Sequence, residues 1–189
     1  MIAGTIAVSI TALWSAAGAA VAHRLSTRLA PATSSDAAAA FLLAAAAGDA
    51  ALAVNAGLAG AIACSGLTSA AILDARSGYL VDELTLSTAA LALGFALVGP
   101  NAASALIGMT TLAGLAALTN LISRVAPLGW GYVKAFLALG AGLGLERAGL
   151  ALGIACLFGL VAAALTRRRE VRFGPHLAVG AVVALGGGA

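Results

Sequence analysis

The sequence predicts an all-α, polytopic transmembrane helix bundle of about eight spans, and three observations support this fold class. Of 189 residues, 62% are hydrophobic and 9% are charged, and the mean hydropathy is +1.07. A soluble domain carries about 25% charged residues, so these few charges would not cover a soluble globule of this size. Apolar stretches near the length of a membrane crossing follow one another between short polar segments. Alanine and glycine dominate these apolar stretches, which predicts close helix packing in lipid. The whole chain, 1–189, is expected to form a single integral membrane domain.

The polar segments divide the chain into its expected spans. The first, Ile2 to Ala22, is long enough to cross a membrane. It lacks a basic amino-terminal region and runs into His23, which is typical of a retained helix rather than of a cleaved signal peptide. Asp49 interrupts the second span, and the last is short and rich in glycine. The eight spans are expected at about 2–22, 36–53, 57–75, 84–100, 102–122, 130–145, 148–166 and 173–187.

Short connections separate three pairs of these spans, at Asn55-Ala56-Gly57, Gly99-Pro100-Asn101 and Glu146-Arg147. With these connections, all but one of the ten basic residues fall on one side of the membrane. The positive-inside rule makes that side cytoplasmic and places both termini outside. Arg147 is the exception, and the other nine are Arg24, Arg28, Arg76, Arg124, Lys134, Arg167, Arg168, Arg169 and Arg172. Topology therefore accounts for the net charge of +3, and no nucleic-acid partner is indicated.

Asp74 is the first candidate functional residue. It directly follows the apolar run SGLTSAAIL, at the expected cytoplasmic end of the third span. An ionisable group at a membrane span is costly and indicates function unless it only reaches the head groups at a helix end. Asp82 and Glu83 instead come just before the fourth span. Acids at that position cap the helix or interact favourably with its dipole. Capping is the preferred interpretation of that pair.

Tyr132 begins the sixth span and is expected at the same membrane depth as Asp74. Gly129 and Gly131 precede it and allow the backbone to bend and to approach a neighbour closely. Lys134, two residues further on, either neutralises a nearby acid or extends its charge to the head groups.

The two cysteines, Cys64 and Cys156, lie far apart inside apolar stretches. They indicate neither a metal site nor a disulfide framework, and no cofactor is expected.

Four segments carry a resemblance to a known family. AAILDARSGYLVDELTLSTAALAL (70–93) resembles the first aspartate motif of the type IV prepilin peptidases. GWGYVKAFLALGAGLG (129–144) is similar to their second motif, Gly-x-Gly-Asp-Val-Lys. AAGAAVAHRLSTR (16–28) and RFGPHLAVGA (172–181) resemble the first helix and a late Phe-Gly-Pro segment of the family. The four occur in the family's order along the chain.

The resemblance implies a multi-pass aspartyl protease of the bacterial inner (cytoplasmic) membrane. Such enzymes cut the leader from prepilins and pseudopilins at the cytoplasmic face, and some then methylate the new amine with S-adenosylmethionine. The family's two catalytic aspartates correspond to Asp74 and to position 132.

The chain departs from the family pattern at Tyr132, which stands where the second aspartate is expected. Val81 and Ser26 also replace prolines of the motifs, and a zinc-ribbon insertion of many members is missing from 23–35. An aspartyl protease needs two carboxylates that share one proton, one acting as base and the other as acid. Tyrosine has an unperturbed pKa of about 10, so at neutral pH it donates a hydrogen bond but does not act as the base.

Four interpretations remain open from the sequence. In the first, the chain is a pseudo-peptidase that binds a pilin-like transmembrane helix or another membrane-complex subunit. In the second, it is a working peptidase that recruits another carboxylate, and Asp82 is the nearest in sequence. Alternatively, Tyr132 is an altered residue made to trap substrate, or the chain belongs to another class, such as a transporter or a structural subunit. A transporter more often shows internal repeats, and this sequence has no clear repeat.

Overall fold

The computed structural model describes residues 43, 46–48, 57–123, 128–167 and 171–186. The described residues are helical apart from short turns and contain no strand, which confirms the all-α fold class. The helices are α3 (Gly57–Ser77), α4 (Asp82–Val98), α5 (Ala102–Ile122), α6 (Trp130–Thr166) and α7 (Phe173–Gly186). The expected span 2–22 lies outside the described residues, as does most of 36–53.

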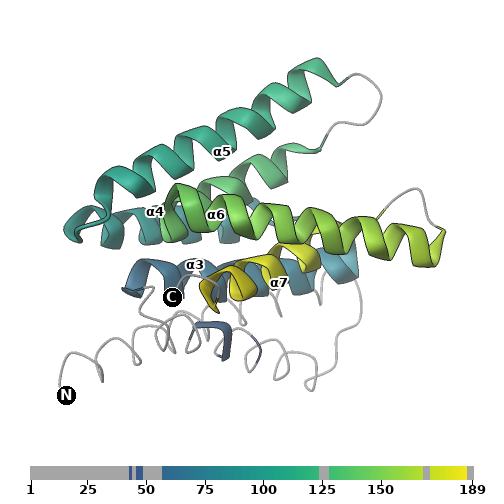
Figure 1. The fold of residues 1–189 in the computed structure, drawn as a ribbon, viewed down its shortest axis with the longest axis horizontal. Coiled ribbons are helices and arrows are strands. Elements are labelled where there is room, and N and C mark those ends of the chain that lie inside the picture. Colours follow the sequence, from purple (N-terminus) through teal and green to yellow (C-terminus); the bar gives the residue numbers. More distant parts are fainter. Residues whose placement is uncertain (1–42, 44–45, 49–56, 124–127, 168–170, 187–189) are drawn as a thin grey trace.

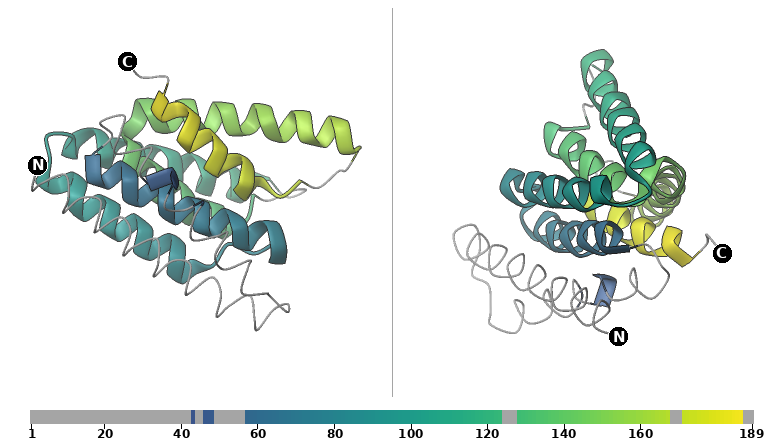
Figure 2. Two further views of the ribbon diagram at one scale, coloured as in Figure 1. Left: turned by 90° about the horizontal axis from the view of Figure 1, so that it is seen from below. Right: turned by 90° about the vertical axis from the view of Figure 1, so that its left-hand side faces the viewer.

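Helices α3, α4 and α5 run in alternating directions, and α6 runs back in the opposite direction to α5 and then reverses within its own length (Figure 1). The turn between α3 and α4 and the starts of α6 and α7 therefore meet at one end of the bundle. The turn between α4 and α5 lies at the opposite end (Figure 1). Helices α3 and α7 pack side by side, as further views show (Figure 2). This arrangement brings segments that are far apart in the sequence to a common end.

A break at Gly144 divides α6. This residue has φ 71° and ψ 179°, a conformation that glycine adopts without a side-chain clash. The chain changes direction sharply there (Figure 1). The expected division fell at Glu146-Arg147, which was wrong by two residues because both of these residues continue the helix. The backbone conformation, rather than the pair of charges, sets the break.

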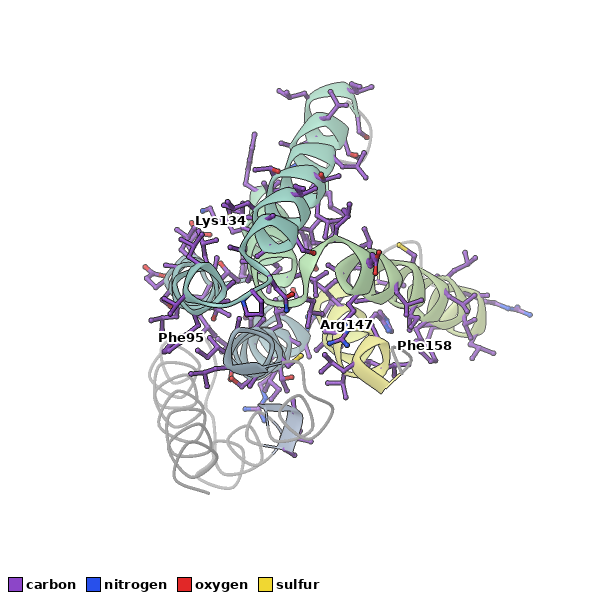
Figure 3. The ribbon with its side chains drawn as sticks, turned by 60° about the vertical axis from the view of Figure 1, so that its left-hand side comes forward. Phe95, Lys134, Arg147 and Phe158 are labelled. Atoms are coloured by element: carbon purple, nitrogen blue, oxygen red, sulfur yellow. The ribbon has the colours of Figure 1, made fainter. Side chains whose placement is uncertain are left out.

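Three of the described helices, α3, α5 and α6, are long and apolar enough to cross a membrane, and α7 contains a shorter apolar helix. The total of eight spans stays a prediction. Large apolar side chains project outward from α5 and from the later part of α6, where Phe158 lies (Figure 3). The most exposed of them include Leu115, Leu118, Leu121, Ile122, Leu157, Leu160 and Leu165. So continuous an apolar exterior matches a lipid environment rather than water.

Small residues bring the helices close together, as the composition predicts. A Cβ atom added to Gly140 of α6 would lie 2.4 Å from the carbonyl carbon of Gly108 in α5. A Cβ added to Gly66 of α3 would lie 2.2 Å from the hydroxyl oxygen of Thr88 in α4. The backbones of α5 and α6 are therefore in near contact, and the Thr88 side chain of α4 lies directly against the α3 backbone, as is typical of membrane bundles.

Candidate functional site

Asp74 lies in the last turn of α3 and is 2% exposed. Its Oδ2 atom accepts two hydrogen bonds, from the backbone N–H of Gly174 at 2.9 Å and from the Tyr132 hydroxyl at 3.1 Å. A buried carboxylate is costly unless donors satisfy it. Here one donor comes from α7 and the other from α6, so the carboxylate joins three helices.

Tyr132 lies in the first turn of α6, and its hydroxyl makes two contacts. It donates to Asp74 and accepts a hydrogen bond from the backbone N–H of Phe173 at 3.1 Å. The rings of Tyr132 and Phe173 pack edge to face, with centroids 5.8 Å apart and planes at 70°. The structure thus brings Asp74 and Tyr132 together, as their matching positions at helix ends suggested.

The two glycines before Tyr132 shape the start of α6 in different ways. Gly129 has φ 89°, a left-handed conformation that favours glycine, and it turns the chain into the helix. A Cβ atom on Gly131 would lie 3.0 Å from Cβ of Leu80 in the turn after α3. The absence of a side chain at Gly131 therefore lets the first turn of α6 lie against that turn, next to the end of α3.

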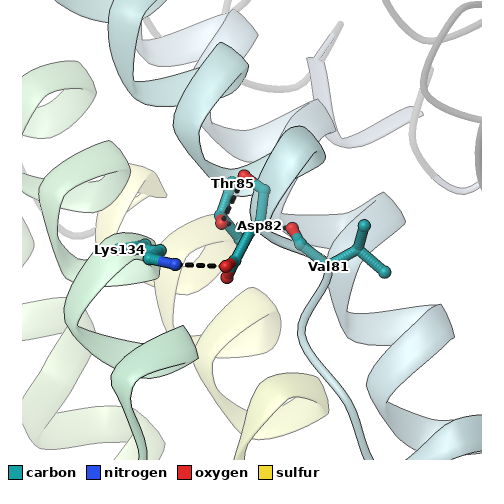
Figure 4. Close-up of polar contacts among 4 residues, drawn as sticks. All are labelled: Val81, Asp82, Thr85 and Lys134. Atoms are coloured by element: carbon teal, nitrogen blue, oxygen red, sulfur yellow. Dashed lines mark hydrogen bonds and ion pairs between the residues drawn. The ribbon is translucent and has the colours of Figure 1, made fainter.

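Lys134 forms an ion pair with Asp82 (Figure 4). The pair links α6 to α4 at the edge of the site, since the Asp82 side chain is 55% exposed and that of Lys134 is 26% exposed. Lys134 thus has an acidic partner, which is the alternative that the family resemblance favours. Solvent screens such a pair, so it contributes at most about 1 kcal/mol.

Asp82 and Glu83 lie inside the first turn of α4 rather than before it, because the helix begins two residues earlier than expected. Val81 occupies the capping position and makes no capping side-chain bond, so the expectation of a side-chain cap was wrong. Both acids remain at the end of the helix that favours negative charge. Val81 has φ −77°, a value that the proline expected there would also adopt.

The start of α7 completes the site, and the sequence did not predict this. Besides the two backbone donors, the Arg172 guanidinium donates to the Ala75 carbonyl oxygen at the end of α3. A Cβ atom on Gly174 would lie 2.6 Å from Oδ2 of Asp74. Pro175 could have indicated this helix start, because proline favours the first turn of a helix. Backbone N–H groups there lack partners within the helix and can donate to an acid.

Within the described ranges, no three His, Cys, Asp or Glu side chains are grouped as a metal ion requires. Cys64 is buried and Cys156 is exposed, and both are free thiols. The chemistry of the site therefore belongs to one carboxylate, one phenol and the backbone donors of α7.

The apolar exterior and the buried carboxylate at the helix ends define an integral membrane protein with a polar site at one end of its bundle. Residues 61–164 match the type IV leader peptidase family, and the chain belongs to this family. The matched range contains both Asp74 and Tyr132.

The chain is also similar to a prepilin leader peptidase/N-methyltransferase of Neisseria gonorrhoeae. The two are 34% identical over 131 residues, which cover 65% of this chain and 46% of the relative. The matched part of the chain thus spans about half the length of this relative. No solved structure matches the chain.

Proposed function

We propose that this chain is a pseudo-peptidase of a bacterial inner membrane, which binds a membrane partner without cutting it at a useful rate. The partner is a prepilin- or pseudopilin-like transmembrane helix or a subunit of a membrane complex, bound with the site at the cytoplasmic face. The hydrogen bond between Tyr132 and Asp74 carries the proposal, because it puts a phenol against the carboxylate where the family motif has a second aspartate.

The chemistry of the pair supports the loss of cleavage. Peptide hydrolysis by two aspartates requires a base that takes a proton from water and an acid that polarises the carbonyl. At neutral pH the Tyr132 hydroxyl supplies a donor and no base. Its hydrogen bond and that of Gly174 occupy Oδ2 of Asp74, and the residue is 2% exposed. The arrangement leaves a lone, shielded carboxylate.

The alternative of an active peptidase that uses Asp82 has less support. Asp82 is paired with Lys134 and half exposed, whereas Asp74 is buried and bonded to Tyr132 and Gly174. Two carboxylates share a proton only when they lie close together. Among the described residues, no hydrogen bond joins Asp82 to Asp74.

An apolar groove beside the site supports the binding part of the proposal. It is lined by α3, α7 and residues 43, 46 and 47, and it passes Ala75 and Pro175, the chain neighbours of Asp74 and Gly174. Its other lining residues are Leu43, Ala46, Ala47, Thr68, Ala71, Ile72, Ala178, Val179, Val182 and Val183. This apolar lining beside the site is a surface on which part of an apolar transmembrane helix would pack.

A cleavage assay in membranes tests the catalytic part. It compares the chain, Tyr132→Asp, and Tyr132→Asp combined with Asp74→Asn on a leader-bearing prepilin. We expect no useful cleavage by the chain, cleavage by Tyr132→Asp, and its loss in the double variant. One acid or base group typically contributes about 10²–10⁴-fold, and the gain is smaller if the pocket has repacked around the phenol.

Two outcomes would contradict this expectation. If the chain itself cleaves and Asp74→Asn abolishes the cleavage, the pseudo-peptidase proposal is wrong and another residue supplies the second acid. If Tyr132→Asp stays inactive on several prepilins, the chain has lost more of the catalytic machinery than the second aspartate.

Photocrosslinking tests the binding part. A photoreactive residue at Ile72, in the groove, should crosslink to a co-expressed prepilin helix. The same residue at Leu115 of α5, which is 55% exposed, serves as the lipid-facing control. Equal crosslinking from both positions would argue against the groove as the binding surface.

A further inference from the structure

The first turn of α7 and Arg172, the residue before it, supply three contacts to two other helices. The backbone N–H of Gly174 donates to Asp74, the backbone N–H of Phe173 donates to Tyr132, and the Arg172 side chain donates to the Ala75 carbonyl. The first four N–H groups of a helix have no partner within the helix. In α7, two of them are satisfied by the candidate site itself.

Gly174 is the point of closest approach between α7 and the site. It is buried, and an added Cβ would lie 2.6 Å from Oδ2, 3.0 Å from Cγ and 2.9 Å from Cβ of Asp74. Three atoms of the Asp74 side chain thus occupy the space that a methyl group on Gly174 would need. A residue larger than glycine would therefore move the Asp74 side chain or separate α7 from α3.

From these contacts we infer that Gly174 is a positioning residue of the site, and that the start of α7 holds the Asp74–Tyr132 pair in one fixed arrangement. The inference rests on the site proposed above but not on its activity. The phenol takes part on both sides, since it donates to the carboxylate and accepts from α7. Tyr132 therefore turns the meeting point of three helices into a closed network: Asp74 accepts from Tyr132 and Gly174, and Tyr132 accepts from Phe173.

Tyrosine NMR tests the inference directly, because the chain contains two tyrosines, Tyr79 and Tyr132. Protein labelled with ¹³C at the tyrosine Cζ should give two signals, and Tyr79→Phe assigns them. Gly174→Ala should shift the Tyr132 signal and leave the Tyr79 signal in place, because the hydrogen-bond partner of the Tyr132 phenol has moved. Gly153→Ala is the matched control, since an added Cβ there meets nothing within 4 Å. An unchanged Tyr132 signal in Gly174→Ala would overturn the inference.

A second measurement covers the case in which Gly174→Ala does not fold. Asp74→Ala removes the two atoms that lie 2.6 Å and 3.0 Å from the added methyl group and leaves only Cβ. Gly174→Ala should therefore lower the yield of folded protein, or its thermal stability, by less in the Asp74→Ala chain than in the unaltered chain. The effects of the two substitutions on thermal stability should then be non-additive. Equal losses with and without Asp74 would overturn the inference. Neither readout depends on cleavage, so the result stands apart from the test of the pseudo-peptidase proposal.

Discussion

At the residue scale, the Tyr132 side chain links three helices through a single oxygen atom. A phenol and a carboxylate differ in reach as well as in chemistry, and here the longer side chain contacts both Asp74 and the Phe173 backbone. The same oxygen donates one hydrogen bond and accepts another, which an ionised carboxylate does not do. The single Tyr132 oxygen thus links α6 to both α3 and α7, and the proposed loss of cleavage rests on the same residue.

Tyr132→Phe tests this structural role, because it removes the hydroxyl and keeps the ring packed on Phe173. The variant should lose about 1–3 kcal/mol of free energy of unfolding, since a buried carboxylate and a backbone N–H each lose a partner. Detergent-solubilised protein titrated with SDS provides the measurement. Tyr79→Phe is the control, because Tyr79 is 72% exposed and should change stability by less than about 0.5 kcal/mol. If Tyr132→Phe were as stable as the unaltered chain, the Tyr132 hydroxyl would have no role in holding the helices together.

At the element scale, the sequence predicted which helix ends meet but not everything that holds them. Asp74 and Tyr132 could be paired because each lies at the end of an apolar stretch on the same expected side of the membrane. Phe173 and Gly174 act through their backbone N–H groups, which every residue except proline has, so side-chain chemistry gave no sign of them. The break in α6 was placed two residues too late for a related reason: the charges of Glu146 and Arg147 suggested the connection, whereas the backbone of Gly144 makes it.

The crossing of α5 and α6 gives a prediction at this scale. Gly140→Ala would place a methyl group 2.4 Å from backbone atoms of Gly108 and Met109, which cannot move aside without shifting α5. The free energy of unfolding should fall by about 1–3 kcal/mol, as measured by SDS titration. Gly114→Ala on α5 is the matched control, because its added Cβ meets nothing within 4 Å and alanine favours helix by up to about 1 kcal/mol. If both variants changed the free energy of unfolding by similar amounts, the close approach of α5 and α6 at Gly140 would not be what limits their packing.

At the scale of the whole molecule, the alternation of helix directions, together with the reversal inside α6, gathers the site at one end of the bundle (Figure 1). The end of α3 and the starts of α4, α6 and α7 all contribute to it or to its edge. The exposed apolar side chains of α5 and of later α6 lie between the two ends, where lipid would surround them. The orientation of this bundle then decides whether the site faces the compartment in which a prepilin leader would lie.

Cysteine labelling of intact cells tests that orientation. In a chain with Cys64 and Cys156 replaced by alanine, Asn101→Cys lies in the α4–α5 turn and Tyr79→Cys lies in the turn after α3, beside the site. Both positions are exposed, so neither reaction is limited by burial. The excess of arginine and lysine expected on the site's side makes that side cytoplasmic by the positive-inside rule. An impermeant maleimide should therefore label Asn101→Cys in intact cells and Tyr79→Cys only after the membrane is permeabilised. The reverse pattern would place Asp74 and Tyr132 at the outer face, where a cytoplasmic leader cannot reach them, and would contradict both the topology and the proposed prepilin partner.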